Sequence, residues 1–230
     1  MKILALETST QAGSVALLDG DILTERPVIG RPGHSETLLP ETVALLRDCG
    51  VSLAEVDAIA FGAGPGAFTG LRLACGVAQG LALGAGKPVL PISNLEALAS
   101  QCPGEAVFVA IDARMSEVYF AAYRRRDGDL VEVLAPGCAA PDAVHLPAEG
   151  DWAGFGSAFQ AYREALVDGL GARLVCFDGA PQAQAGAIAR VAAGRFLRGE
   201  GIDPVLAGPL YVRDKVALTT EERLARGGRA

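Results

Sequence analysis

Histidine and closely spaced cysteine are scarce in this sequence of 230 residues. Two histidines poorly supply a zinc site, because zinc in proteins is bound mostly by histidine and cysteine. The five cysteines lie far apart along the chain, which excludes a C-x-x-C clip and a dense disulfide framework. We therefore expect reduced core thiols in a cytoplasmic protein.

Long apolar runs are also missing. The longest uncharged apolar stretch of the glycine-rich middle, residues 73–86, has 14 residues, whereas a membrane-spanning helix needs about 20. The apolar segment at residues 3–6 is too short for the core of a signal peptide. We expect no membrane segment.

Basic residues are fewer than acidic residues. Lysine and arginine number 20 against 27 acidic residues, so the formal net charge is −7. Such a surface repels phosphate backbones on average, which argues against broad nucleic-acid binding by this chain alone. Half of the residues are hydrophobic and a fifth are charged, which excludes an intrinsically disordered protein.

The pattern of apolar and turn residues predicts an α/β protein built twice on one plan. In the first half we expect strands over 3–7, 14–18 and 22–25, a helix over 34–49, a strand over 58–61, a helix over 69–84, a strand over 88–92 and a helix over 95–101. In the second half we expect strands over 107–112, 118–123 and 130–134, a loop over 136–150, a strand over 152–155, a helix over 158–167, a strand over 174–177 and a helix over 183–197.

Each half thus begins with a three-stranded meander whose first strand ends in an acid, Glu7 or Asp112. This repeat predicts two similar α/β lobes. We place the N-terminal lobe at residues 1–103 and the C-terminal lobe at 104–216, followed by a flexible tail at 217–230.

Three local motifs have structural explanations as well as functional ones. Residues 62–67 match G-x-G-x-x-A, but they follow a meander and no acid lies about 20 residues on, as a dinucleotide site requires. Asp112, Arg114 and Glu117 suit either acid–base chemistry or a salt-bridged turn, and we favour the turn. Arginines 124–126 are better explained as charges guarding a strand edge than as an RNA patch.

The helix expected over 69–84 is unusual in its glycines. Gly76, Gly80 and Gly84 are four residues apart and share one helix face. Each costs roughly 1 kcal/mol relative to alanine, and close approach of another backbone is the usual compensation. That backbone belongs either to the same lobe or to another chain.

Five motifs together resemble the TsaB family, also called YeaZ. They are E-T-S at 7–9, H-S-x-x-L-L-P at 34–40, G-x-G-P-G-x-F-T-G-L-R at 62–72, I-D-A-R-M-S-E-V-Y at 111–119 and G-P-L-Y-V-R at 208–213. The resemblance extends over nearly the whole chain. It implies a two-lobed actin-like fold of the sugar kinase/Hsp70/actin class, RNase H-like, with a mixed sheet and helices in each lobe.

The resemblance also implies a function in forming threonylcarbamoyladenosine next to the anticodon of tRNAs that read ANN codons. In that family TsaB is the non-catalytic scaffold and activator of its paralogue TsaD, which transfers the threonylcarbamoyl group. The implied assembly is a heterodimer with TsaD that the ATPase TsaE joins. The chain alone is expected to form a homodimer and to meet tRNA only through the complex.

TsaD carries H-x-E-A-H, whose two histidines hold a metal. The matching stretch here, residues 94–98, reads N-L-E-A-L, and neither Asn94 nor Leu98 supplies an imidazole. The resemblance therefore implies no metal, no cofactor and no catalytic residues. Two alternatives from other classes stay open: an ATP-dependent phosphotransferase on the same fold and a metallopeptidase. Residues 112–115 lack the glycines of a phosphate-binding turn.

We expect the partner surface on the helices over 34–49 and 69–84. The candidate contact residues are His34, Leu38, Leu39, Val43, Phe68, Thr69, Arg72, Leu73, Gly76, Val77 and Gly80.

Overall fold

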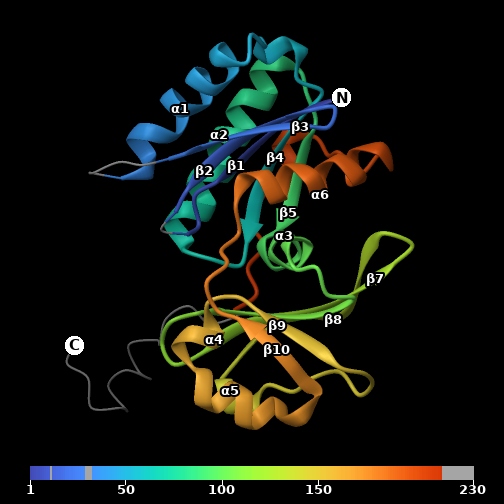
Figure 1. The fold of residues 1–230 in the computed structure, drawn as a ribbon. Coiled ribbons are helices and arrows are strands. Elements are labelled where there is room, and N and C mark those ends of the chain that lie inside the picture. The colour runs from blue at the N-terminus through green and yellow to red at the C-terminus, as the bar shows by residue number, and fades with distance from the viewer. Residues whose placement is uncertain (11, 29–32, 214–230) are drawn as a thin grey trace, which may run out of the picture.

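The computed structural model describes residues 1–10, 12–28 and 33–213, so the tail expected at 217–230 lies outside the described residues. Two five-stranded sheets stand one above the other (Figure 1). The first sheet contains β1 (Lys2–Glu7), β2 (Ser14–Asp19), β3 (Ile22–Pro27), β4 (Ala58–Gly64) and β5 (Val89–Ser93). The second sheet contains β6 (Ala106–Asp112), β7 (Val118–Arg126), β8 (Asp129–Ala139), β9 (Trp152–Phe155) and β10 (Leu174–Asp178).

The two sheets have the same topology. The strand order is β3-β2-β1-β4-β5 in the first sheet, and the second sheet, read from its other edge, is β8-β7-β6-β9-β10. In each, an antiparallel meander is followed by strands that join in parallel, β4 beside β1 and β9 beside β6. The prediction of a duplicated plan is confirmed, and with it the two-lobed, actin-like α/β class.

Alternation along β1 directs its side chains to two separate cores. Leu4 and Leu6 pack with α1 (His34–Asp48) and α2 (Phe68–Ala85) on one face of the first sheet. Ile3 and Ala5 pack on the other face against α6 (Ala185–Leu197). All four are fully buried. The central strand of this lobe is therefore apolar on both sides, as expected for a sheet covered by helices on both faces.

The position of α6 corrects the expected domain boundaries. Its residues fall in the range 104–216 that was assigned to the C-terminal lobe, yet Ile188 and Ala192 are buried against strands of the first sheet. The chain thus returns to the first lobe after completing the second sheet, and Figure 1 shows α6 beside β5 in the upper lobe. The first lobe therefore consists of the first sheet with α1, α2 and α6.

The second lobe is the second sheet with α4 (Ala158–Ala161) and α5 (Arg163–Leu170), which cover the face that contains Phe108 and Trp152. Its other face, which contains Val107 and Val109, packs against α3 (Asn94–Gln101). Because Ala97 of the same helix contacts the core beneath α6, α3 lies between the lobes.

Two local predictions about the second half are wrong. The helix expected over 158–167 is interrupted at Tyr162, whose φ of −131° and ψ of 38° lie outside the helical region, so α4 and α5 are separate. The loop expected from residue 136 begins later, because β8 extends to Ala139. There Gly137 lies opposite Phe120, whose ring occupies the space of the missing side chain.

The glycines of α2 serve two different purposes. A Cβ on Gly70 would overlap the carbonyl oxygen of Thr8, so only glycine lets the helix start approach the β1–β2 turn. The hydroxyl of Thr8 donates to the carbonyl of Gly70 at 2.7 Å. At Gly76, Gly80 and Gly84, by contrast, nothing lies within 4 Å of the added carbon.

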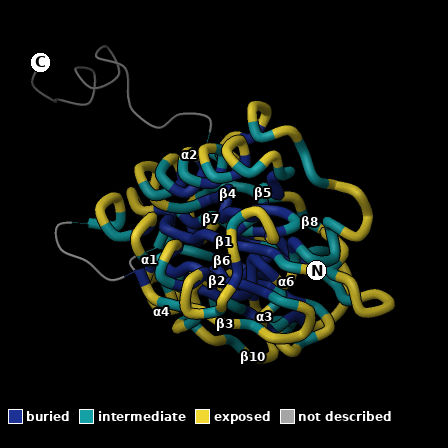
Figure 2. The backbone as a smooth tube through the Cα atoms, turned by 90° about the horizontal axis from the view of Figure 1, so that it is seen from above, coloured by how far each residue is buried: buried dark blue, intermediate teal, exposed yellow. Residues whose placement is uncertain are grey.

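By length and composition alone, α2 is apolar enough to cross a membrane, and 33% of the 18-residue window that passes this test is buried inside the protein. A single such helix is weak evidence for a membrane span, because core helices of water-soluble proteins also pass this test. Figure 2 shows exposed residues along the outer side of α2 and buried ones toward the sheet.

The contrast within α2 predicts opposite effects of one substitution. Gly76→Ala should stabilise the monomer by about 1 kcal/mol, because alanine loses less backbone entropy in a helix and meets open space. Gly70→Ala should destabilise it by about 1–3 kcal/mol, because the methyl group overlaps the Thr8 carbonyl. Urea unfolding at a protein concentration that keeps the chain monomeric measures both. Equal shifts in the two variants would contradict this account of the helix.

Candidate functional site

The β1–β2 turn is built on a buried carboxyl group. Glu7 ends β1 and is fully buried. Its Oε1 accepts hydrogen bonds from the backbone N–H and the hydroxyl of Ser9. Asn94, at the start of α3, donates from Nδ2 to Ser9 Oγ at 2.6 Å and to the Pro65 carbonyl at 3.3 Å. The network therefore joins β1, the turn, the end of β4 and α3.

Burial raises the pKa of Glu7 to about 7, because removal from water disfavours the carboxylate more than the Ser9 bonds favour it. Glu7 Oε2 and Asn94 Oδ1 have no hydrogen-bond partner among the described residues. Both oxygens lie over Gly62, where a Cβ would overlap Oε2. Burial alone favours the protonated acid, because the polar groups of Ser9 and Asn94 lower the pKa of Glu7.

Asn94 and Leu98, which the resemblance aligns with the two histidines of TsaD, have structural roles here. Asn94 is 2% exposed and braces the turn, while Leu98 is 1% exposed and packs in the core between α3 and the second sheet. A hydrocarbon side chain has no atom that binds a metal. Within residues 1–10, 12–28 and 33–213, no group of three His, Cys, Asp or Glu side chains is arranged to hold a metal ion.

The β6–β7 turn of the second lobe is also held by a carboxylate. Asp112 Oδ1 accepts from the Arg114 backbone N–H at 2.8 Å and from the Tyr162 hydroxyl at 3.1 Å, and Oδ2 pairs with the Arg114 guanidinium at 3.2 Å. The interpretation as a salt-bridged turn is confirmed for this pair. Glu117 instead pairs with Arg213 at 2.6 Å.

The same turn contains three successive residues in the left-handed region. Arg114, Met115 and Ser116 have φ values of 60°, 57° and 59°. This conformation costs roughly 1–2 kcal/mol for each residue other than glycine. Such a conformation persists only where surrounding contacts hold it.

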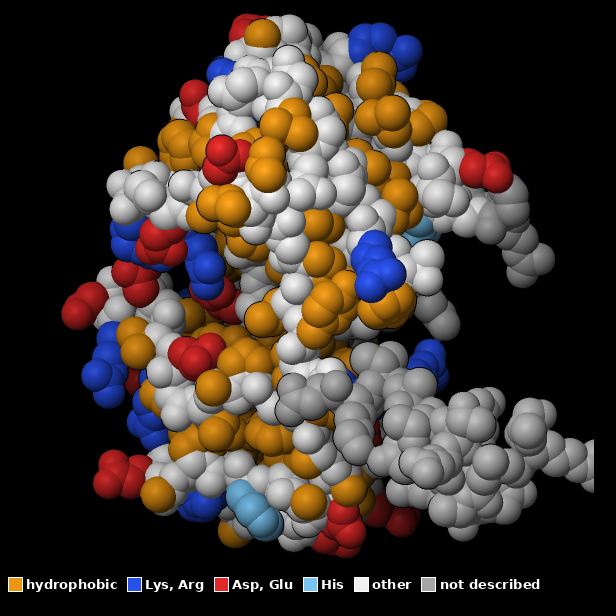
Figure 3. Space-filling model, turned by 180° about the vertical axis from the view of Figure 1, so that it is seen from behind, with side chains coloured by type: hydrophobic (Ala, Val, Ile, Leu, Met, Phe, Trp, Pro, Cys, Tyr) orange, Lys and Arg blue, Asp and Glu red, His pale blue; other side chains and the backbone are white. Residues whose placement is uncertain are grey.

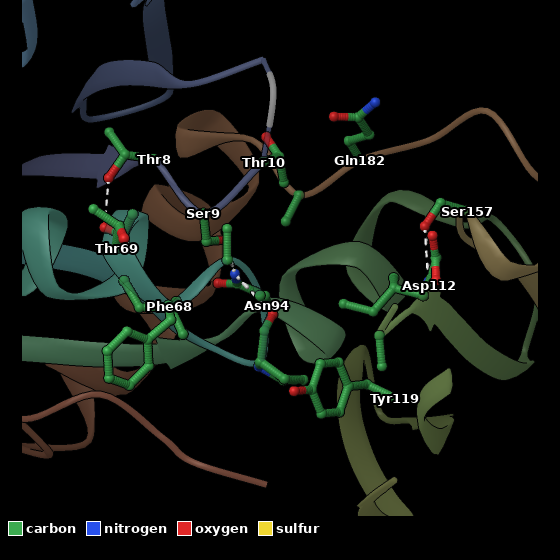
Figure 4. Close-up of a pocket in the computed structure, with 18 of the residues that line it drawn as sticks. Thr8, Ser9, Thr10, Phe68, Thr69, Asn94, Asp112, Tyr119, Ser157 and Gln182 are labelled. Atoms are coloured by element: carbon green, nitrogen blue, oxygen red, sulfur yellow. Dashed lines mark hydrogen bonds between the residues drawn. The ribbon is translucent and has the colours of Figure 1, made fainter. Parts of the chain in front are cut away.

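The two turns face each other across a cavity of about 1420 Å³ between the lobes. Figure 4 shows Thr8, Ser9 and Thr10 on one side and Asp112 and Ser157 on the other, with Tyr119 below them. Three arginines and one carboxylate are among the described residues that line it. Glu7 does not line this cavity, so its carboxyl group is not available to a molecule bound there.

The outer face of α2 and the adjoining side of α1 form an apolar surface. Leu39 and Val43 on α1 and Phe68 and Leu83 on α2 are 46%, 57%, 43% and 57% exposed. All three helix glycines lie on this side and meet nothing in the described chain. The alternative that their cost is offset by packing inside the same lobe is therefore wrong. Figure 3, which shows the side where α2 lies, has many hydrophobic and few charged side chains over the upper lobe.

The candidate contact residues separate into three groups. Leu38 is fully buried in the core of the first lobe, so its prediction as a contact residue is wrong, because this residue of the apolar helix face points at the sheet. His34 lines the interlobe cavity, and its Nδ1 lies 3.3 Å from the Thr8 carbonyl. The exposed or half-buried members are Leu39, Val43, Phe68, Thr69, Arg72, Leu73, Gly76, Val77 and Gly80. Of these, Phe68, Thr69, Arg72 and Leu73 at the start of α2 also line the interlobe cavity.

Sequence reasoning did not single out Tyr211, which adjoins this surface. Its ring centroid lies 5.8 Å from that of Phe68, and its hydroxyl accepts from Arg72 Nε at 3.1 Å. The Arg72 guanidinium lies 3.8 Å from the Phe68 ring centroid. Tyr211 is 139 residues from Arg72 in the chain, so only its place in the G-P-L-Y-V-R motif indicated that it matters.

Comparison with protein families and curated proteins gives matches over most of the chain. The model of the family described as TsaD, tRNA N6-adenosine threonylcarbamoyltransferase, matches residues 24–168. TsaB of Escherichia coli (strain K12), a tRNA threonylcarbamoyladenosine biosynthesis protein, is 36% identical over 233 residues, 94% of this chain and 96% of that protein. TsaB of Haemophilus influenzae is 49% identical over 124 residues, 52% of each.

Two solved structures from Pseudomonas aeruginosa are similar over the whole fold. One is described as an uncharacterized protein with similarity to peptidase YEAZ and has a TM-score of 0.84, 38% identity and coverage of 92% of this chain and 99% of its own. The other, described as YeaZ, has a TM-score of 0.82, 38% identity and coverage of 91% and 99%.

The raised pKa of Glu7 predicts how stability depends on pH. Between the ordinary value of 4.5 and about 7, the folded state keeps a proton that the unfolded state has lost, so the free energy of unfolding falls as pH rises through this window, by roughly 3 kcal/mol in total. Glu7→Gln is neutral at every pH and should remove this decrease. The measurement is urea unfolding of both proteins from pH 4.5 to 8.

The control is Glu36→Gln, on the exposed side of α1. It should reproduce the pH dependence of the unsubstituted protein. If Glu7→Gln retains the full decrease above pH 4.5, Glu7 is not the group that holds the proton.

Proposed function

The chain belongs to the TsaB family, and from that membership we propose that it serves in threonylcarbamoyladenosine formation as a non-catalytic partner of TsaD. The proposed interface is the outer face of α2 with the exposed side of α1. The observation that carries the proposal is the row of Gly76, Gly80 and Gly84, which faces open space along an apolar helix.

Glycine inside a helix lowers stability unless something approaches the bare backbone. Nothing in the described chain does so on this face. Exposed apolar side chains on both sides of the row add area that a partner helix would remove from water. A second chain that packs against α2 supplies both compensations, and a close helix–helix contact is the geometry for which three aligned glycines are suited.

A non-catalytic role fits the side chains at positions 94 and 98. Both line the interlobe cavity, but the Asn94 amide nitrogen is bonded to Ser9 and Pro65, and the Leu98 hydrocarbon has no atom for acid–base or metal chemistry. Glu7 is buried away from the interlobe cavity. The proposal assigns the chemistry to TsaD and the positioning of TsaD to this chain.

The same surface serves self-association when TsaD is absent, and TsaE joins the assembled pair. Contact with tRNA is made through the complex, which is consistent with a net charge of −7 on this chain. We place the protein in the cytoplasm, where tRNA is modified.

Substitution of a leucine on the glycine face tests the interface. Gly76→Leu should weaken the complex with TsaD about tenfold or more, because the added side chain occupies the space of the approaching backbone, at a cost of roughly 1–3 kcal/mol. Light scattering after size exclusion and a titration with purified TsaD measure the loss. Threonylcarbamoyladenosine formation in a reconstituted reaction should fall in parallel.

Gly169→Leu is the matched control, since Gly169 lies on α5 of the second lobe and also meets nothing within 4 Å. It should bind TsaD as the unsubstituted chain does. A Gly76→Leu variant that binds TsaD unchanged would reject this surface. Turnover of a substrate by the purified chain alone, abolished by changing its own side chains, would reject the non-catalytic role.

A further inference from the structure

After α6 the chain crosses from the first lobe to the second along residues 207–213, which we call the strap. Its first residue is fixed to α2, where the Gln79 amide donates to the Ala207 carbonyl at 3.0 Å. At its middle, the Leu210 backbone N–H donates to the Ala63 carbonyl at 2.7 Å, next to the end of β4. The red end of the described chain in Figure 1 passes between the two lobes.

Close packing fixes the middle of the strap. A Cβ on Gly64 would lie 2.7 Å from the Leu210 carbonyl oxygen, and the φ of Gly64 is +123°, which only glycine adopts readily. The strap therefore runs over bare backbone at this point. Its path cannot shift toward β4.

The next residue of the strap belongs to the proposed docking surface. Tyr211 is 49% exposed, and its contacts are the Phe68 ring and the Arg72 guanidinium. A protein that packs on the start of α2 meets this aromatic and guanidinium group. Fixing Phe68 and Arg72 therefore fixes Tyr211 as well.

Two residues later the strap reaches the strained turn of the second lobe. The Arg213 guanidinium donates to the carbonyls of Ala113 and Arg114 at 3.0 and 3.4 Å and pairs with Glu117 at 2.6 Å. It also lies 5.4 Å from the Tyr119 ring centroid, and its side chain is 14% exposed. One half-buried cation thus holds the carbonyl groups at the beginning of the left-handed segment.

We propose that the strap couples protein docking on α2 to the β6–β7 turn, so that a bound partner tightens the turn that closes one side of the interlobe cavity. The choice of TsaD as that partner rests on the proposed function, whereas the coupling itself is a property of the free chain. A partner that binds Tyr211 and Arg72 in the arrangement seen here favours the strap position in which Arg213 holds the turn.

The first experiment uses the free chain and hydrogen exchange at the turn. The amides of Ala113 and Glu117 report on it, since they are bonded to the Glu117 and Arg114 carbonyls. Arg213→Gln removes the guanidinium that bonds to the turn carbonyls and to Glu117, and it should speed the exchange of these two amides. Arg72→Gln, on the other lobe, should speed it about fivefold or more, which is the lower end of typical coupling between sites.

Arg47→Gln is the control, because Arg47 lies exposed on α1 and pairs only with its neighbour Asp48 among the described residues. It should leave exchange at the turn unchanged. If Arg213→Gln speeds exchange but Arg72→Gln does not, Arg213 holds the turn without any coupling to α2, and the proposal is overturned. If neither does, it is overturned as well.

The second experiment adds purified TsaD. In the unsubstituted chain, binding should slow exchange both along α2 and at residues 113–117; in Arg213→Gln, the slowing along α2 should persist and that at the turn should disappear. Slowing at the turn in both proteins would mean direct contact there and would overturn the coupling. Absence of any TsaD binding would reject the proposed function, while the free-chain result would still decide on the strap.

Discussion

The close approach of α2 and α3 to the β1–β2 turn is the constraint on which the rest of the structure depends. Gly70 admits the Thr8 carbonyl, and the Ser9 hydroxyl joins Glu7 to Asn94. A buried polar network is stable only when its members are satisfied. Here Ser9 satisfies Glu7 Oε1 and accepts from Asn94, and its carbonyl accepts from the Ala67 N–H at 3.0 Å, which fixes the start of α2.

The position of α2 decides both proposed properties of the protein. With its start held on the turn, the helix presents Gly76, Gly80 and Gly84 outward, and Leu39 and Val43 of the neighbouring helix α1 are exposed as well. The same start places Phe68 beside Tyr211, where the strap leaves for the second lobe. A docking surface and a link to the interlobe cavity therefore share one end of one helix. Asn94 on α3 supports this arrangement through its bonds to Ser9 and Pro65.

Much of the fold could be predicted because apolar periodicity is a local property. The alternation of β1 and the meander that follows it recur at β6, and both sheets have the order that this repeat indicates. The lobe to which α6 belongs could not be predicted, because chain order does not determine which sheet a helix covers. The break at Tyr162 was missed for a similar reason, since the apolar pattern continues through it.

The sequence by itself determined the family, the duplicated α/β plan, the absence of imidazole at positions 94 and 98 and the alignment of three glycines on one helix face. Only the tertiary structure decided which residues of that pattern face outward. Leu38 and Leu39 are neighbours of equal hydrophobicity, yet one is fully buried and the other 46% exposed. Gly70 and Gly76 differ only in what approaches them. Burial and contact are set by elements distant in the chain, and helical periodicity carries no information about their positions.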